Sequence, residues 1–260
     1  MCFDLDSRPP ISPIAGGALD SERPVLEADD GATSGAFLAR AANPSGAAIV
    51  VLPDIRGLHP YYEELALRFA EAGVDALAID YFGRTAGTAT AERPPDFDFR
   101  AHVERTTYAG LTADVRAAAA RLRTGGDARG RALFTIGFCY GGRLSLLAGT
   151  QGLGLAGVVA FYGWPVGDFH AGMPAPAAVA ASMRSPLLAI FGGGDNGIPS
   201  TAVGSFEAAI AAAGVAGEVV VYPGAPHSFF DRKASDWAEA SADAWSRTLA
   251  FVRAHTPPAT

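Results

Sequence analysis

The chain has 260 residues, of which 49% are hydrophobic and 18% are charged, so it can bury at least one substantial core. Its formal net charge is −7 at pH 7, and no cluster of Lys and Arg marks a surface for nucleic acid. The first residues lack the basic and apolar regions of a secretory signal, and no apolar run is long enough to span a bilayer. We therefore expect a cytoplasmic protein that binds neither nucleic acid nor membrane.

The predicted elements alternate between strands and helices along most of the chain. Residues 1–30 mix Pro, Gly, Asp and Ser without a period, so we expect an irregular segment before a single domain of residues 31–260. Apolar runs typical of buried strands occur at 47–53, 74–80, 131–137, 155–162, 186–191 and 218–222. Helical patterns occur at 61–72, 108–123, 141–150, 200–213 and 235–253, and the Pro-rich residues 171–185 suggest a surface loop or a poorly formed helix. This alternation predicts an α/β fold, with a mostly parallel sheet covered by helices on both faces.

The segment Gly137-Phe138-Cys139-Tyr140-Gly141 joins a predicted strand to a predicted helix. A tight strand-to-helix turn makes the residue at its corner project above the sheet edge, and it requires small residues two positions before and after. The N-terminus of the helix also favours a thiolate at the corner. A cysteine in a glycine-rich turn can instead be a small buried apolar residue. Its context nevertheless favours Cys139 as a nucleophile.

An aspartate and a histidine follow this cysteine, each directly after a later predicted strand. Asp195 ends the run FGGGD and His227 lies in PGAPHSF, so both should lie at the same sheet edge as Cys139. There, His227 would move the thiol proton, and Asp195 would fix the imidazole and balance its charge. Asp195 could also be a turn residue that caps the next helix, and His59 is the rival histidine because it lies near the same edge.

Acyl transfer also needs two N–H donors for the oxyanion that develops. One is expected from the backbone of Tyr140, and the other from Ile55 in the loop after the first buried strand. Asp54 in that loop would lie near the thiol, where its carboxylate could accept the thiol proton or keep the thiol neutral. Alternatively, Asp54 caps the following turn or pairs with Arg56.

Together these segments resemble the dienelactone hydrolase family, which has the α/β-hydrolase fold. The resemblance covers about residues 45 to 254 and rests on VVLPDIRGLHPYYEELALRFAEAGVDALAIDYFGR, GFCYGGR, VVAFYG, FGGGD and PGAPHSFFDR. It implies a triad of Cys139, His227 and Asp195, with oxyanion-hole amides from Tyr140 and Ile55.

The resemblance also bears on the substrate. Asp54 stands where the family carries a glutamate that interacts with the nucleophile, and it is one methylene shorter. Arg84 stands at a position that binds the substrate carboxylate, and Arg232 would be the second such arginine, although its spacing from His227 is one residue longer. The first candidate substrate is therefore an anionic lactone such as dienelactone.

We expect a cofactor-free hydrolase of lactones or small carboxylic esters, either a monomer or a small homo-oligomer, that acts through a thioester. No Cys/His cluster has the spacing of a metal site. One alternative is a non-catalytic or redox-sensing thiol protein of the same fold. A glutamine-amidotransferase-like enzyme is a further alternative, but Ser228 and Phe229 follow His227 where that chemistry has a glutamate two residues later.

Overall fold

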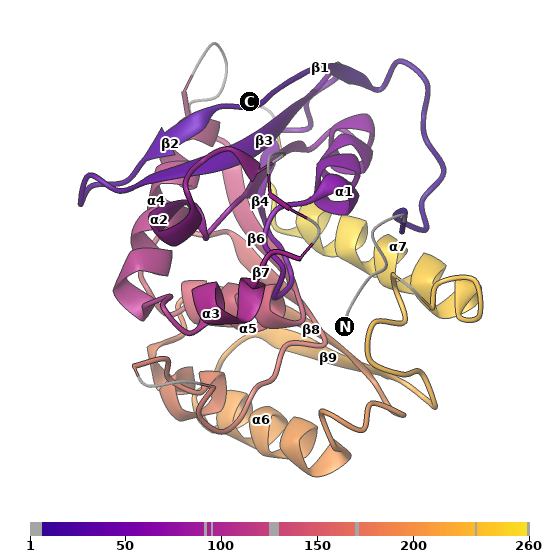
Figure 1. The fold of residues 1–260 in the computed structure, drawn as a ribbon. Helices are drawn as coiled ribbons and strands as arrows, with labels where there is room; N and C mark the ends of the chain where they lie inside the picture. The colour runs from indigo at the N-terminus through magenta and orange to yellow at the C-terminus, as the bar shows by residue number, and fades with distance from the viewer. Residues whose placement is uncertain are drawn as a thin grey trace.

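A mixed sheet of nine strands organises the chain (Figure 1). The computed structural model describes residues 7–258 except 91–92, 95, 125–129, 170–171 and 232. The strand order is β1-β3-β5-β4-β6-β7-β8-β9, and β2 pairs with β3. The strands are β1 (Ala18–Glu22), β2 (Val25–Glu27), β3 (Thr33–Ala41), β4 (Ala47–Leu52), β5 (Asp75–Ile79), β6 (Ala132–Phe138), β7 (Gly157–Phe161), β8 (Leu187–Gly192) and β9 (Gly217–Tyr222).

The six strands from β4 to β9 are parallel to one another, which confirms the predicted α/β fold. Every residue of β4, β5, β6, β7 and β8 is buried, as continuous apolar sequences require when helices cover both faces of a sheet. Each of these strands lies within two residues of its predicted bounds.

Helices cover both faces of the sheet. In Figure 1, α1 (Pro60–Glu71) and α7 (Ala238–Ala254) lie on one side, and the rings of Phe69 and Trp245 join them at 4.7 Å. On the other side lie α4 (Tyr108–Leu122) and α5 (Tyr140–Ala148). The remaining helices are α2 (Gly83–Ala86), α3 (Phe99–Val103), α6 (Ser200–Ala212) and the 3₁₀ helix η3 (Pro176–Ser182), which lies within the predicted Pro-rich stretch. No helix in the described part of the chain is long and apolar enough to cross a membrane.

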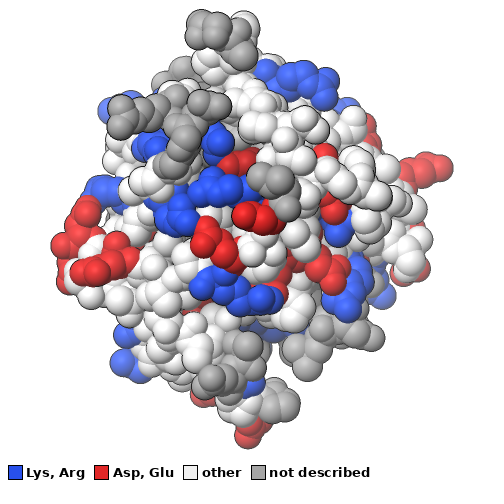
Figure 2. All heavy atoms as spheres, turned by 90° about the horizontal axis from the view of Figure 1, so that it is seen from above, with Lys and Arg blue, Asp and Glu red and all other residues white. Residues whose placement is uncertain are grey.

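The prediction of an irregular segment at residues 1–30 is wrong for its second half, because β1 and β2 lie there. Both pair antiparallel with β3, which pairs antiparallel with β5. These strands are short and partly exposed, and their sequences contain no continuous apolar run. They therefore depend on pairing with β3. Ion pairs add to this attachment, such as Glu22–Arg121 and Arg23–Glu63. On the face seen in Figure 2, basic and acidic side chains are accordingly interspersed, with no large area of one sign.

Candidate active site

The backbone at Cys139 has the strained geometry expected of a nucleophile elbow. Cys139 lies between β6 and α5 with φ 54° and ψ −114°, a conformation that side-chain-bearing residues rarely adopt. A Cβ added at Gly137 would lie 1.9 Å from the carbonyl oxygen of Gly141. One added at Gly141 would lie 2.0 Å from the carbonyl oxygen of Leu52. The turn therefore requires both glycines, and it packs Gly141 against the end of β4.

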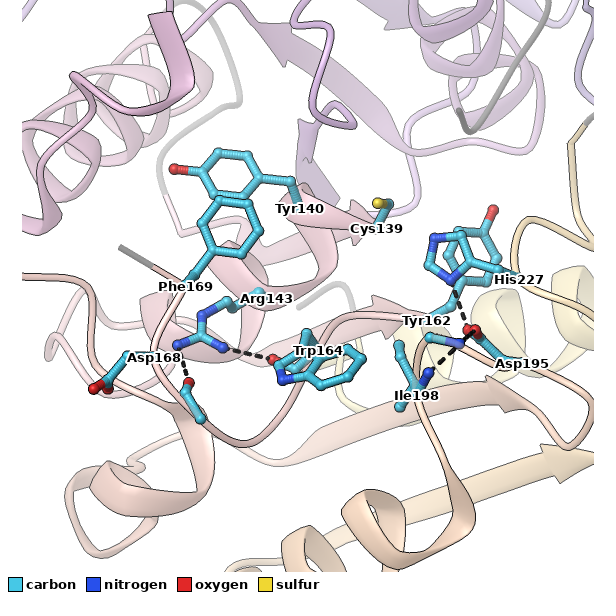
Figure 3. Close-up of a pocket in the computed structure, with 12 residues that line it drawn as sticks. Cys139, Tyr140, Arg143, Tyr162, Trp164, Asp168, Phe169, Asp195, Ile198 and His227 are labelled. Atoms are coloured by element: carbon cyan, nitrogen blue, oxygen red, sulfur yellow. Dashed lines mark hydrogen bonds and ion pairs between the residues drawn. The ribbon is translucent and has the colours of Figure 1, made fainter. Parts of the chain in front are cut away.

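The structure brings together the predicted acid and histidine. Asp195 follows β8 and His227 follows β9, and their Oδ2 and Nδ1 atoms are 2.6 Å apart. Figure 3 shows the imidazole between the carboxylate of Asp195 and the side chain of Cys139, with its second nitrogen on the cysteine side. The ring is therefore oriented for proton transfer between the thiol and a bound substrate.

Asp195 is held as an anion that orients this imidazole. Its side chain is 1% exposed, and its Oδ1 accepts the backbone N–H groups of Gly197 and Ile198 at 2.8 and 3.2 Å. Burial raises the pKa of Asp195, but hydrogen bonds from His227 and from these two amides outweigh burial and lower the pKa below its ordinary value. Asp195 thus binds the turn after β8 as well as His227, but it does not cap the next helix, because the N-cap residue of α6 is Pro199.

His59, the rival histidine, lies beside Arg56 and Asp54. It is the N-cap residue of α1, and its Nε2 lies 3.5 Å from Nη2 of Arg56. Burial, with a further contribution from the charge of Arg56, lowers the pKa of His59 to about 3. The 3.9 Å approach of Nε2 to Oδ1 of Asp54 is therefore not an ion pair at neutral pH, because His59 is uncharged there.

The two expected oxyanion donors lie at the same edge of the sheet. Tyr140 is the first residue of α5, where backbone N–H groups have no acceptor within the helix. Ile55 lies three residues beyond β4, which pairs in parallel with β6 up to Leu52 opposite Gly137. Tyr81 fixes this loop, because its hydroxyl hydrogen is shared between the carbonyl oxygens of Pro53 and Asp54.

Asp54 is completely buried, and its carboxylate binds Arg56. One oxygen accepts the backbone N–H of Arg56 at 2.8 Å, and the other accepts from Nη2 at 3.2 Å. The N–H of Asp54 donates to the hydroxyl of Tyr62 at 2.9 Å. The turn-capping and pairing role considered for Asp54 is therefore present, and its effect on the thiol remains a prediction.

A cavity of about 590 Å³ opens beside the cysteine. Aromatic side chains form much of its wall, and it also contains two charged residues that the sequence did not single out, Arg143 and Asp168. Its lining consists of Cys139, Tyr140, Arg143, Tyr162, Trp164, Gly167, Asp168, Phe169, Asp195, Gly197, Ile198 and His227.

The structure does not bring Arg84 to this cavity. Arg84 lies on α2, and its guanidinium binds Asp30 and Asp114 at 2.7 and 2.9 Å. Although burial opposes it, the hydrogen bonds that Arg84 donates to these two carboxylates raise the pKa of Arg84 above its ordinary value. Its expected role in binding a substrate carboxylate is therefore not supported, because these two acids occupy the guanidinium. Arg232 lies outside the described residues.

Several residues of the cavity wall were not predicted from the sequence, and only some of them have a recognisable signal in it. Arg143 follows the elbow in GFCYGGR, and Tyr162 in VVAFYG comes directly after a strand, so both occupy positions at the active edge. Trp164, Asp168 and Phe169 lie on an irregular loop, whose path no periodicity determines. Among the described residues, no group of three or more His, Cys, Asp and Glu is arranged to hold a metal ion.

Comparison with known proteins assigns this fold and site to a family. The sequence profile of the dienelactone hydrolase family matches residues 35–256. A Methylorubrum extorquens protein described as "Putative carboxymethylenebutenolidase" is 34% identical over 207 residues, which are 79% of this chain and 71% of that protein. An Escherichia coli K12 protein of the same description is 31% identical, over 79% of this chain and 76% of that protein.

Solved structures agree with this assignment. A Klebsiella pneumoniae structure described as "Putative Dienelactone Hydrolase" superposes with a TM-score of 0.77 at 30% identity, covering 90% of this chain and 98% of that one. A dienelactone hydrolase-like phosphotriesterase from metagenomic libraries shares the fold, with a TM-score of 0.73 at 22% identity and coverage of 93% and 100%. The chain belongs to the dienelactone hydrolase family and is a hydrolase of ester or lactone bonds.

Proposed function

We propose that this protein opens lactones or small carboxylic esters through a thioester on Cys139, without a cofactor. The observation that carries the proposal is the 2.6 Å contact of His227 with Asp195, with the imidazole facing the elbow cysteine (Figure 3). Family membership supports ester and lactone chemistry, and no feature of the site favours the amidotransferase alternative.

In the first half of the reaction, His227 takes the proton of the thiol as the sulfur of Cys139 attacks the carbonyl carbon. The carbonyl π electrons move onto oxygen, and the backbone N–H groups of Tyr140 and Ile55 stabilise the resulting oxyanion. The tetrahedral intermediate collapses, the bond from carbon to the leaving oxygen breaks, and His227 returns the proton to that oxygen. An ester releases its alcohol at this point, whereas an opened lactone keeps its hydroxyl on the acyl chain.

In the second half, His227 takes a proton from water while the water oxygen attacks the thioester. Collapse of the second tetrahedral intermediate breaks the carbon–sulfur bond, and the proton returns to the sulfur. Asp195 stabilises the imidazolium in both halves and keeps the Nδ1 hydrogen on its own side of the ring. The products are a carboxylic acid and an alcohol, or a hydroxy acid from a lactone.

Intact-mass spectrometry after rapid mixing with an activated ester tests the nucleophile. We expect an added acyl mass on the wild type, located by digestion at Cys139, and none on Cys139→Ala. In His227→Ala the thioester should form at a rate at least about 100-fold lower, because general-base catalysis contributes on that order. An acyl group located on another residue would contradict the proposal.

The redox-sensing alternative predicts a different pattern. In that case peroxide would oxidise Cys139, but no ester or lactone would form an adduct or be turned over above the rate of Cys139→Ala.

A further inference from the structure

We propose that the substrate of this site is a neutral lactone or ester carrying an aromatic ring, which packs against Tyr140, Trp164 and Phe169. This inference rests on the proposed function, because it specifies the substrate class of the same site. It differs from the anionic lactone expected from the sequence.

The wall of the cavity beside Cys139 is aromatic. The rings of Tyr140 and Phe169 pack at 5.0 Å with an interplanar angle of 36°, and Figure 3 shows them on the side of the cysteine opposite His227. Trp164 continues this wall toward Ile198. Tyr140 contributes a ring that is uncharged at neutral pH, and burial raises its pKa further, to about 12. An aromatic ligand gains both apolar burial and favourable ring contacts against such a wall.

Arg143 is the one Lys or Arg among the described residues of the cavity wall, and other groups already bind its terminal nitrogens. Its Nη1 donates to the carbonyls of Trp164 and Val166 at 3.1 and 3.5 Å. Its Nη2 donates to three further carbonyls, those of Gly167, Met173 and Pro174, at 2.8 to 3.4 Å.

Recognition of a carboxylate by arginine usually requires two parallel N–H groups. In Arg143 only Nε, which is buried, lacks an acceptor among the described residues. Arg143 therefore cannot clamp a substrate carboxylate without giving up contacts to the loop. Arg84 is bound to Asp30 and Asp114 and does not replace it.

The cavity also carries a negative charge that opposes an anionic substrate. Asp168 lies on the loop beside Phe169, with an exposed side chain at the cavity wall. Asp195 adds a second carboxylate, which His227 and backbone amides bind. A carboxylate entering this space would lose its hydration and be repelled by the charge of Asp168, whose side chain points away from Cys139 in Figure 3, whereas a neutral aromatic ring avoids both costs.

Three lactones distinguish the effect of an aromatic ring in the substrate from the effect of a negative charge on it. They are dihydrocoumarin, which is neutral and aromatic, δ-valerolactone, which is neutral and aliphatic, and the anionic 5-oxotetrahydrofuran-2-carboxylate. Each kcat/KM is divided by the rate constant of that lactone with hydroxide, so that intrinsic reactivity cancels. We expect the normalised value for dihydrocoumarin to exceed that of the anionic lactone at least about tenfold, with δ-valerolactone between them.

Two variants test the cavity wall directly. Phe169→Ala should lower the preference for dihydrocoumarin over δ-valerolactone about threefold, whereas Val25→Ala, which truncates an exposed apolar residue on β2, should not change it. Asp168→Asn should raise the ratio of anionic to neutral turnover several-fold at low ionic strength, and added salt should reduce this gain. Asp20→Asn removes the same charge from β1 and should leave the ratio unchanged.

The outcomes separate this inference from the proposed function. Turnover with the anionic lactone preferred, or a Phe169→Ala variant with an unchanged preference, would overturn the substrate class alone. If no lactone or ester is hydrolysed and no acyl adduct forms on Cys139, the proposed function fails, and the substrate class fails with it.

Discussion

Backbone strain in this protein is concentrated around the candidate active site. Among the described residues, Cys139, Tyr162 and Ser228 are the ones other than glycine with positive φ, at 54°, 39° and 62°. Tyr162 packs its ring 4.9 Å from the imidazole of His227, and Ser228 directly follows that histidine. The hydroxyl of Tyr162 also donates to buried Asp231 at 3.1 Å, which holds this strained residue beside the site. Surrounding structure must stabilise such conformations, so they indicate residues whose position matters for function.

Gly141→Ala tests how tightly the elbow is packed. The new Cβ would lie 2.0 and 2.2 Å from the carbonyl oxygens of Leu52 and Pro53, and backbone atoms cannot move aside as a flexible side chain can. We expect the free energy of unfolding to fall by about 3 kcal/mol or more, with loss of activity because the loop of Ile55 is displaced.

Gly204→Ala is the matched control for this change. Gly204 lies in α6, and a Cβ there meets no heavy atom within 4 Å. This variant should be more stable by about 0.5–1 kcal/mol, as measured by urea unfolding, because alanine favours the helix. Equal stability of the two variants would show that the elbow tolerates a side chain.

Arg84→Gln tests the reassignment of Arg84 from substrate binding to structure. Its partner Asp114 has a side chain that is 1% exposed, so the substitution leaves a buried carboxylate without its cation. We expect a loss of about 3 kcal/mol in the free energy of unfolding. Arg116→Gln, which breaks an exposed pair with Asp29, should cost less than about 1 kcal/mol.

Kinetics complete the test of Arg84. If Arg84 acts only in folding, the ratio of kcat/KM for anionic and neutral lactones stays at the wild-type value. A selective loss of the anionic lactone would restore Arg84 as a substrate-binding residue.

At the level of elements, a single side chain organises the loop that forms the aromatic wall. Arg143 lies near the start of α5 and is completely buried. Its guanidinium donates to five carbonyl oxygens between Trp164 and Pro174. Irregular loops leave many carbonyls without strand or helix partners, so one guanidinium with several N–H groups can satisfy them together. The rigidity of the pocket wall thus depends on α5, which begins directly after the proposed nucleophile Cys139.

Arg143→Met tests this role. We expect the free energy of unfolding to fall by about 3 kcal/mol, because several buried carbonyls lose their donors. Proteolysis should also become faster between residues 164 and 174, which mass spectrometry of limited digests would show. In Arg123→Met, which removes one exposed contact to the carbonyl of Gly154, both quantities should change little. Unchanged digestion of the loop in Arg143→Met would contradict the role.

The elements also show which features a sequence can predict. Continuous apolar runs predict the strands β4 to β9. The glycines predict the elbow, because a Cβ at Gly137 or Gly141 would lie only 1.9 or 2.0 Å from a carbonyl oxygen. The strands β1 and β2 depend on pairing with β3, and the loop from Trp164 to Pro174 depends on Arg143. Such long-range contacts leave no local period. The placement of Arg84 likewise depends on Asp30 and Asp114, which are distant in the chain.

For the molecule as a whole, several ionisable groups are buried around the sheet. Asp75 joins β5 to Arg40 and Arg131, and Asp80 binds Arg93. Each of these acids has a cationic partner. His59 differs, because it is buried beside the cation of Arg56 and remains neutral with a pKa of about 3.

This depressed pKa predicts a loss of stability in mild acid. The unfolded chain binds a proton at His59 near pH 6.5, whereas the folded protein does so only near pH 3, so acid favours unfolding. The stability due to a neutral His59 is complete above pH 6.5 and declines as pH falls toward 3. Lowering the pH from 7 to 5 should therefore reduce the free energy of unfolding by about 2 kcal/mol.

His59→Gln removes this titration while retaining a polar side chain near Asp54 and Arg56. Urea unfolding at pH 7, 6 and 5 should show that the variant loses about 2 kcal/mol less than the wild type over this range, even if it is less stable at pH 7. His255→Gln, at the exposed C-cap of α7, should keep the slope of the wild type. An unchanged slope in His59→Gln would contradict the depressed pKa, because it would mean that His59 binds its proton equally well in the folded and unfolded protein. A larger loss in the variant than in the wild type would indicate that His59 forms an ion pair with Asp54 in the folded protein.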